Sequence, residues 1–121
     1  MEWSFRSDAP IYAQLCRQLT EAIAAGVYAP GERLPTVREL AMEAGVNPNT
    51  VQRALGELER SGLVYSQRTA GRYVTEEPGR VTVERDFMAQ KVAEEFYAAM
   101  ARLGFDRVQS RMYLERMGGE Q

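Results

Sequence analysis

VNPNTVQRALGEL, at residues 46–58, combines the start of a helix with two helix faces of opposite character. Asn47 is a residue type that caps helices, and Pro48 suits the first helical position because no N–H is needed there. Apolar residues recur at helical spacing: Val51, Ala54, Leu55 and Leu58. The opposite face has the same spacing and is polar or small: Asn49, Gln52, Arg53 and Gly56. The stretch predicts an amphipathic helix that begins at Pro48 and ends before Gly62.

A second helix is predicted directly upstream, over residues 36–44. Thr36 and Glu39 have the spacing of a capping box, in which each side chain bonds the free backbone N–H of the other residue. Gly45 suits the end of this helix, so only a very short turn separates the two helices. Such a pair is typical of the helix-turn-helix, whose second helix enters the major groove of DNA.

The polar face of the second helix of this pair has side chains that suit base recognition. Asparagine and glutamine can pair with adenine, and arginine with guanine. No acidic residue precedes Glu57 on this helix, so its first half does not repel phosphate. Asn49, Gln52 and Arg53 are therefore predicted to contact DNA, although polar residues on a solvent-facing helix are also common in other proteins.

The surrounding sequence predicts a helix before this pair and a hairpin after it. The expected elements are a helix over residues 10–26, a connector over 27–35 and two short strands over 63–67 and 72–75. The turn between the strands makes them a wing that carries Arg68 and Arg72. The predicted fold class is mainly α with a small β-hairpin wing: a winged helix-turn-helix followed by a C-terminal helical dimerisation unit.

A breaker, Glu76-Glu77-Pro78-Gly79, predicts the boundary between two domains. Residues 1–76 are expected to form the DNA-binding domain and residues 77–121 a two-helix tail. The tail helices are predicted over about 83–103 and 106–117. Their apolar faces contain Met88, Val92, Phe96, Ala99, Leu103, Val108 and Met112.

The tail is predicted to be a dimerisation unit, because two helices alone cannot enclose a typical small-molecule pocket of ~300 Å³ or more. A second copy of the chain would cover the apolar faces. The alternative is that the tail folds back on its own winged helix. A two-fold homodimer would present two recognition helices to half-sites about 34 Å, or a multiple of it, apart.

Composition makes an enzyme unexpected. The chain of 121 residues has no histidine and one cysteine, Cys16, so it lacks the commonest general base and the usual zinc ligands. We therefore expect no metal and no cofactor. No apolar run approaches ~18 residues, and no leader is recognisable, so a cytoplasmic protein without a membrane partner is expected. Cys16 is expected to be a packed thiol, with a redox sensor as the alternative.

Charge alone does not favour a nucleic-acid partner. The net charge is −2, and residues 1–75 carry eight arginines against eight acidic residues. Fourteen of the fifteen basic residues are arginine, which suits forked contacts with phosphates and bases. A G·C-rich genome would favour arginine codons as well.

Three separated motifs resemble the GntR family of bacterial regulators. They are Pro10-Ile11-Tyr12, Pro30-Gly31-Glu32-Arg33-Leu34-Pro35-Thr36-Val37-Arg38-Glu39-Leu40-Ala41 and Val46-Asn47-Pro48-Asn49-Thr50-Val51. The Asn-Pro-Asn-Thr-Val run and the short tail resemble its YtrA subfamily. The resemblance implies a winged helix, a dimer and repression of a nearby operon. Some GntR relatives place arginines where Pro48 and Gln52 stand here, which leaves the affinity and operator sequence open.

The resemblance also implies which residues contact DNA. Together with the basic hairpin, it gives Arg38, Asn47, Asn49, Thr50, Gln52, Arg53, Arg68, Gly71 and Arg72. The function predicted is a sequence-specific transcriptional regulator, a repressor that binds a palindromic operator as a homodimer. The alternative is a winged-helix protein-interaction module that has lost specific DNA binding. Whether a small-molecule effector exists stays open.

Overall fold

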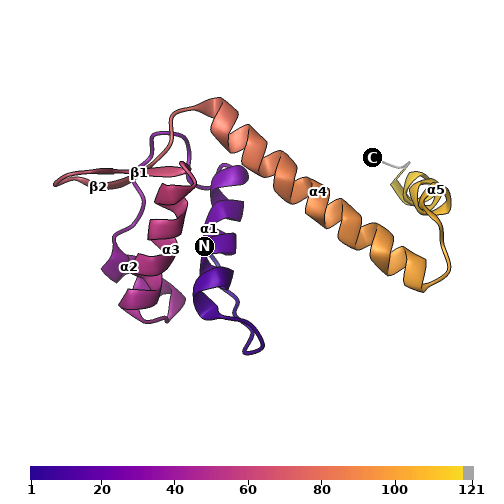
Figure 1. Cartoon of the computed structure of the whole chain (residues 1–121), viewed down its shortest axis with the longest axis horizontal. Helices are drawn as coiled ribbons and strands as arrows, with labels where there is room; N and C mark the ends of the chain where they lie inside the picture. Colours follow the sequence, from indigo (N-terminus) through magenta and orange to yellow (C-terminus); the bar gives the residue numbers. More distant parts are fainter. Residues whose placement is uncertain (119–121) are drawn as a thin grey trace. The chain divides into compact units, whose positions relative to one another are not determined.

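Residues 1–118 are described by the computed structural model, and within them the chain forms five helices and one two-stranded hairpin (Figure 1). The elements are α1 (Ile11–Ala24), α2 (Val37–Ala44), α3 (Pro48–Arg60), β1 (Val64–Gln67), β2 (Gly71–Val74), α4 (Pro78–Arg102) and α5 (Arg107–Gly118). This arrangement confirms the predicted mainly α fold with a hairpin wing. The chain divides into two compact units, Met1–Arg85 and Asp86 onward. None of the helices in residues 1–118 is long and apolar enough to cross a membrane.

The core of the first unit lies between α1, α2, α3 and the hairpin. Both α1 and α2 pack against α3. The largest fully buried apolar side chains are Leu15, Leu19, Leu40, Val51, Leu55, Leu58, Leu63 and Val74. Burying each side chain of this size contributes about 1.5–3 kcal/mol to folding. The apolar residues whose spacing predicted the helices are therefore also the residues whose burial stabilises the packed helices.

Side-chain caps at the start of α2 and of α3, and a left-handed glycine between the two helices, define the helix pair as predicted. The Glu39 N–H donates to Thr36 Oγ1 at 3.1 Å, and the Thr36 N–H donates to Glu39 Oε1 at 2.8 Å. Gly45 ends α2 with φ +69°, and Asn47 Oδ1 accepts from the Asn49 N–H at 2.7 Å at the start of α3. These bonds occupy orphan N–H groups at both helix starts, which determines where α3 begins.

The wing pairs with a third segment that was expected only as a connector. Strands β1 and β2 are antiparallel, with Val64 opposite Val74 and Gln67 opposite Gly71. On the other edge of β2, the Leu34 N–H donates to the Arg72 carbonyl at 2.8 Å and the Val74 N–H to the Glu32 carbonyl at 2.9 Å. The base of the wing is therefore bonded to the chain just before α2.

The long helix begins earlier than expected, at Pro78 instead of about residue 83. The Pro-Gly pair predicted as a breaker opens the helix, because proline fits the first helical turn, where its missing N–H costs no bond. Arg80 Nε donates to the Ser61 carbonyl at 2.8 Å, and Val81 packs against the core. The boundary between the compact units falls after Arg85, whereas the sequence pattern places the domain boundary at residues 76–77.

The second unit consists of the rest of α4 and α5. Asp106 and Gln109 cap α5 reciprocally: the Gln109 N–H donates to Asp106 Oδ1 at 2.8 Å and the Asp106 N–H to Gln109 Oε1 at 2.9 Å. Arg107 pairs with Glu94 at 2.6 Å and thereby ties the start of α5 to α4. Among residues 86–118 only Ser110 is buried, so this part of the chain has no apolar core of its own.

Candidate nucleic-acid interface

The exposed face of α3 presents the side chains that were predicted to contact bases. Asn49, Gln52 and Arg53 are exposed, while Thr50 is half-buried. A Cβ added at Gly56 would meet no atom within 4 Å, so the middle of this face is open. Asn47 is exposed, and its side-chain oxygen is already used by the cap. The structure thus brings the predicted α3 residues onto one side of a rigid helix.

Ion pairing divides the arginines of the first 75 residues into two sets. Half of the eight are paired with a carboxylate: Arg6, Arg17, Arg60 and Arg72. Within residues 1–118, the others make no salt bridge: Arg33, Arg38, Arg53 and Arg68. Four guanidinium groups of this region are therefore available, and four acidic residues are likewise outside the salt bridges: Glu2, Glu32, Glu39 and Glu43. Three of the four arginines had been predicted as DNA contacts.

Arg38 is exposed on α2 beside an apolar groove lined by Val37, Ala41, Met42, Val46 and Pro48. Its sequence neighbour Glu39 is occupied by the capping box. The hydrogen bond from the Thr36 backbone N–H lowers the pKa of the Glu39 carboxyl, so this carboxylate stays ionised and stays at the helix start. Arg38 is consequently free to reach a phosphate.

Arg53 lies over an aromatic ring from another helix. Its Cζ is 3.6 Å from the centroid of the Tyr12 ring on α1. Tyr12 had been noted only as part of a sequence motif and was not among the predicted contacts. A guanidinium whose plane lies parallel to such a ring keeps its N–H groups directed away from the ring.

Arg72 is held by α3 and not directed freely toward solvent. Its Nε donates to Glu59 Oε1 at 2.5 Å, and both side chains are largely shielded, at 21% and 32% exposure. The hydrogen bond from Arg72 holds the pKa of the Glu59 carboxyl below its usual range. This pair ties β2 to the last turns of α3, so Arg72 sets the position of the wing. A DNA contact by Arg72 itself stays a prediction.

The wing turn carries Arg68, which is exposed, and Gly71, whose φ is +108°. A Cβ on Gly71 would lie 3.1 Å from Arg33 Nε, so the Arg33 side chain lies against this glycine. Sequence reasoning missed Arg33 because it lies in the expected connector. The signals were its place in the motif at residues 30–41 and the glycine at 71, and both become informative once the pairing of residues 32–34 with β2 is known.

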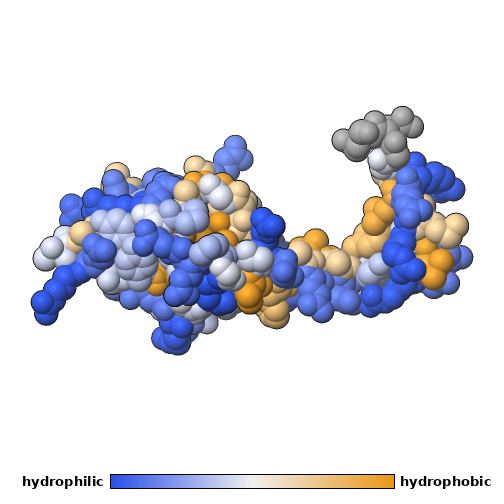
Figure 2. All heavy atoms as spheres, turned by 90° about the horizontal axis from the view of Figure 1, so that it is seen from above, coloured by the Kyte–Doolittle hydropathy of each residue, from blue (hydrophilic) through white to orange (hydrophobic). Residues whose placement is uncertain are grey.

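Large apolar side chains of the tail are exposed. Exposure is 64% for Val92, 73% for Leu103, 54% for Val108 and 62% for Met112. Met88, Phe96 and Ala99 are half-buried. Figure 2 shows hydrophobic surface gathered over the C-terminal part of the chain. The predicted dimerisation residues thus include apolar positions that residues 86–118 leave open to solvent.

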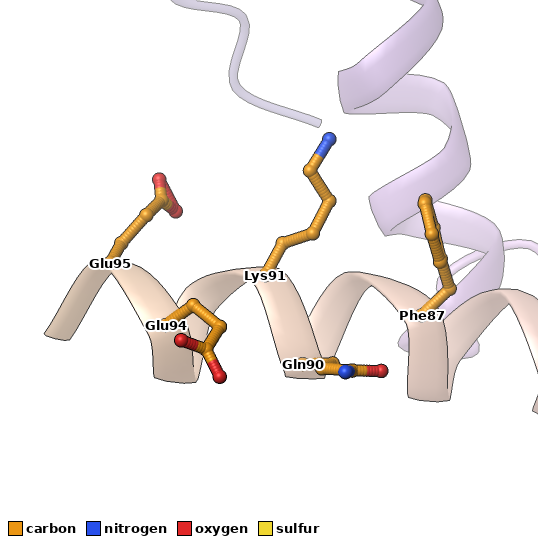
Figure 3. A pocket seen from close by; sticks show the side chains of 5 residues that line it. All are labelled: Phe87, Gln90, Lys91, Glu94 and Glu95. Atoms are coloured by element: carbon orange, nitrogen blue, oxygen red, sulfur yellow. The ribbon is translucent and has the colours of Figure 1, made fainter. Parts of the chain in front are cut away.

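A shallow hollow along α4 is lined by Phe87, Gln90, Lys91, Glu94 and Glu95 (Figure 3). All five side chains come from this single helix, and Lys91 Nζ lies 5.5 Å from the centroid of the Phe87 ring. A small-molecule site normally encloses most of its ligand. A row of side chains on one helix provides no such enclosure, so we assign no effector to it.

The described part of the chain offers few groups for metal binding or thiol chemistry. Among residues 1–118, no group of three or more histidine, cysteine or acidic side chains is placed to hold a metal ion. Cys16 is half-buried and packs against the core, and burial raises the pKa of its thiol. A raised pKa disfavours the reactive thiolate, which supports the packing role over the redox one.

A capped helix pair followed by an anchored hairpin defines a winged helix-turn-helix, the class of DNA-binding domain that inserts its second helix into the major groove. The family model described as bacterial regulatory proteins, gntR family, matches residues 11–74. The chain belongs to the GntR family.

Similar proteins extend this assignment. The chain is 38% identical over 101 residues to the HTH-type transcriptional repressor YtrA of Bacillus subtilis (strain 168), covering 78% of each chain. A GntR family transcriptional regulator from Listeria monocytogenes has a TM-score of 0.85 and 34% identity, over 93% of this chain and 98% of that one. The DNA-binding domain of AraR in complex with operator ORX1 has a TM-score of 0.58 and 31% identity, over 62% and 96%. These similarities confirm a YtrA-like, DNA-binding transcriptional regulator over the protein-interaction alternative.

Proposed function

We propose that the protein is a cytoplasmic repressor that binds a palindromic operator as a homodimer. The observation that carries the proposal is a set of arginines in residues 1–75 that pair with no carboxylate of residues 1–118. Arg53 belongs to the exposed face of α3, Arg38 to α2, and Arg68 to the wing turn. Guanidinium groups without an internal partner are suited to phosphate and base-edge contacts.

In this proposal α3 reads the major groove. Asn49, Gln52 and Arg53 contact base edges, while Asn47 and Thr50 lie near the phosphates at the start of the helix, where backbone N–H groups favour anions. Arg38 contacts the flanking phosphates. The wing adds contacts through Arg68 and the backbone at Gly71.

Homodimerisation through the tail is the second part of the proposal. The exposed apolar side chains of α4 and α5, such as Val92 and Leu103, are the expected contact surface. Apolar side chains of this size left in water lose the burial energy that a second copy would provide. Two linked domains would also match the two halves of a palindromic operator.

The test compares two arginines of the same helix. Binding of the full-length protein to the DNA upstream of its own gene and to a random duplex is measured by gel shift and fluorescence anisotropy at several salt concentrations. Affinity for both duplexes should fall steeply with salt as counterions are released. Arg53→Ala should weaken operator binding by ~1–3 kcal/mol and relax preference at one base pair.

Arg60→Ala is the matched control, because Arg60 lies on the same helix and pairs with Glu57. This variant should bind the operator nearly as the unmodified protein does. Equal losses for both variants would make Arg53 a general charge contact. Failure of the unmodified protein to bind any selected sequence at low salt and micromolar concentration would defeat the proposal.

A further inference from the structure

We propose that Tyr12, on the first turn of α1, is a specificity-determining residue that holds the Arg53 guanidinium in the orientation in which α3 presents it to a base. The inference rests on the proposed DNA-binding function, and it names a residue outside the helix-turn-helix and the wing. Tyr12 acts through Arg53 and is therefore a positioning residue.

The helix that carries the ring packs against the core and against α3. Tyr12 is half-buried and lies at the start of α1, which packs against α3. Leu15 and Leu19, one and two turns further along α1, have no exposed surface. The backbone that carries the ring is therefore packed rigidly against the helix that carries Arg53.

The stack is the contact that orients the Arg53 side chain. The Cζ–centroid distance of 3.6 Å places the guanidinium directly against the ring, and the side chain remains exposed. Within residues 1–118 no carboxylate pairs with Arg53, whereas Glu57 and Glu59 pair with Arg60 and Arg72. An aromatic ring attracts a cation without competing for its N–H donors.

This arrangement leaves free the part of arginine that reads guanine. A forked contact with guanine O6 and N7 uses two N–H groups in the plane of the guanidinium, and the ring covers only its face. An arginine that is already oriented loses less side-chain freedom on binding than one that must be ordered from solution. The gain applies only where Arg53 meets its base, so Tyr12 should contribute to specificity more than to general affinity.

The experiment uses two variants of the full-length protein. Tyr12→Phe keeps the ring and removes only the hydroxyl, and Tyr12→Leu keeps apolar bulk and removes the ring face. Affinities are measured for the operator, for a panel of operators with single base-pair changes, and for a random duplex. Thermal unfolding of each variant verifies that it folds.

Tyr12→Leu should weaken operator binding about two- to five-fold, the range for an exposed cation–π contact, and leave random-duplex binding unchanged. The loss should vanish in the Arg53→Ala background and on the operator changed at the base pair that Arg53 reads. Tyr12→Phe should bind as the unmodified protein does. If Tyr12→Phe loses as much as Tyr12→Leu, or if Tyr12→Leu weakens both duplexes equally, the hydroxyl or general packing is responsible and the inference is overturned.

The stack itself is tested without DNA by NMR. The Nε–Hε resonance of Arg53 should be shifted upfield by the ring in the unmodified protein and in Tyr12→Phe, and should move to its usual position in Tyr12→Leu. An unshifted resonance in the unmodified protein overturns the inference even if the operator is bound. Absence of operator binding by the unmodified protein, with the stack intact, overturns the proposed function and the role of Tyr12 with it.

Discussion

Both acidic residues of α3 bind arginines within the domain. Glu57 pairs with Arg60, and Glu59 pairs with Arg72 of the wing. These carboxylates lie in the second half of α3, so they neutralise positive charge away from the exposed residues of its first half. A domain with a net charge of zero can therefore present a locally basic surface, because the position of each pair matters more than the sum.

The Glu59–Arg72 pair gives a prediction that depends on pH. Because the folded-state pKa of Glu59 is lowered, its stabilising effect is present above the unfolded-state pKa and is lost as pH falls through the folded value. Glu59→Gln should lower the free energy of unfolding at neutral pH by less than ~1 kcal/mol, since the pair is partly exposed. Urea unfolding should show this difference shrinking as the pH falls through the lowered folded-state pKa of Glu59, below which the carboxyl is protonated in both the folded and the unfolded state.

The control for this measurement is Glu57→Gln, whose partner Arg60 is far more exposed. It should change stability less and should not disturb the wing. A Glu59→Gln variant with unchanged stability at neutral pH, or a difference that persists in acid, would contradict the anchoring role.

Arg33 gives the second prediction at this scale. Its side chain lies against Gly71 and makes no salt bridge within residues 1–118, so it is placed to contact a phosphate near the wing. Arg33→Ala should weaken binding to operator and random DNA alike and reduce the salt slope by about one. Arg17→Ala, which removes an arginine paired with Glu21 on α1, should leave both quantities unchanged. A loss confined to the operator would instead indicate base readout.

At the scale of elements, local rules account for what the sequence predicted well. The caps at Thr36 and Asn47 act over two or three residues, so they can be recognised without knowing the fold. The start of α4 was predicted too late because Arg80 and Val81 contact residues far away in sequence. The pairing of residues 32–34 with β2, and the position of Tyr12 beside Arg53, depend likewise on long-range packing that no short pattern encodes.

Substitutions of the α3 cap residue Asn47 should affect stability and DNA binding differently. Asn47→Ala removes the acceptor for the Asn49 N–H and should cost about 0.5–2 kcal/mol of unfolding free energy. Asn47→Asp keeps an acceptor and adds a negative charge at the positive end of the helix, so stability should be retained. The same charge would face phosphate, and operator affinity should fall. Thermal unfolding and anisotropy measured on both variants test this separation, which would fail if Asn47→Asp bound the operator normally.

At the scale of the whole molecule, the two compact units carry complementary properties. Residues 1–85 have a buried core and expose the polar face of α3 together with arginines that pair with no carboxylate in residues 1–118. Residues 86–118 have exposed apolar side chains and only Ser110 buried. A single domain without a strong positive charge is expected to bind DNA weakly. Linking two copies converts the second binding event into an intramolecular one and can raise affinity 10²–10⁴-fold without new contacts.

The last prediction tests whether the tail provides that link. Val92 is 64% exposed on α4, and a glutamate there would place a charge within any apolar contact between two tails. Val92→Glu should shift the protein from dimer to monomer in sedimentation and weaken operator binding by about 10²-fold or more. Its circular dichroism should change little, because Val92 belongs to no buried core.

Gln90→Glu, an exposed position on a different side of the same helix, adds the same charge and should remain dimeric. A monomeric unmodified protein whose stability falls with Val92→Glu would instead mean that the tail folds back on its own domain, and the operator would then have to be bound by each copy alone.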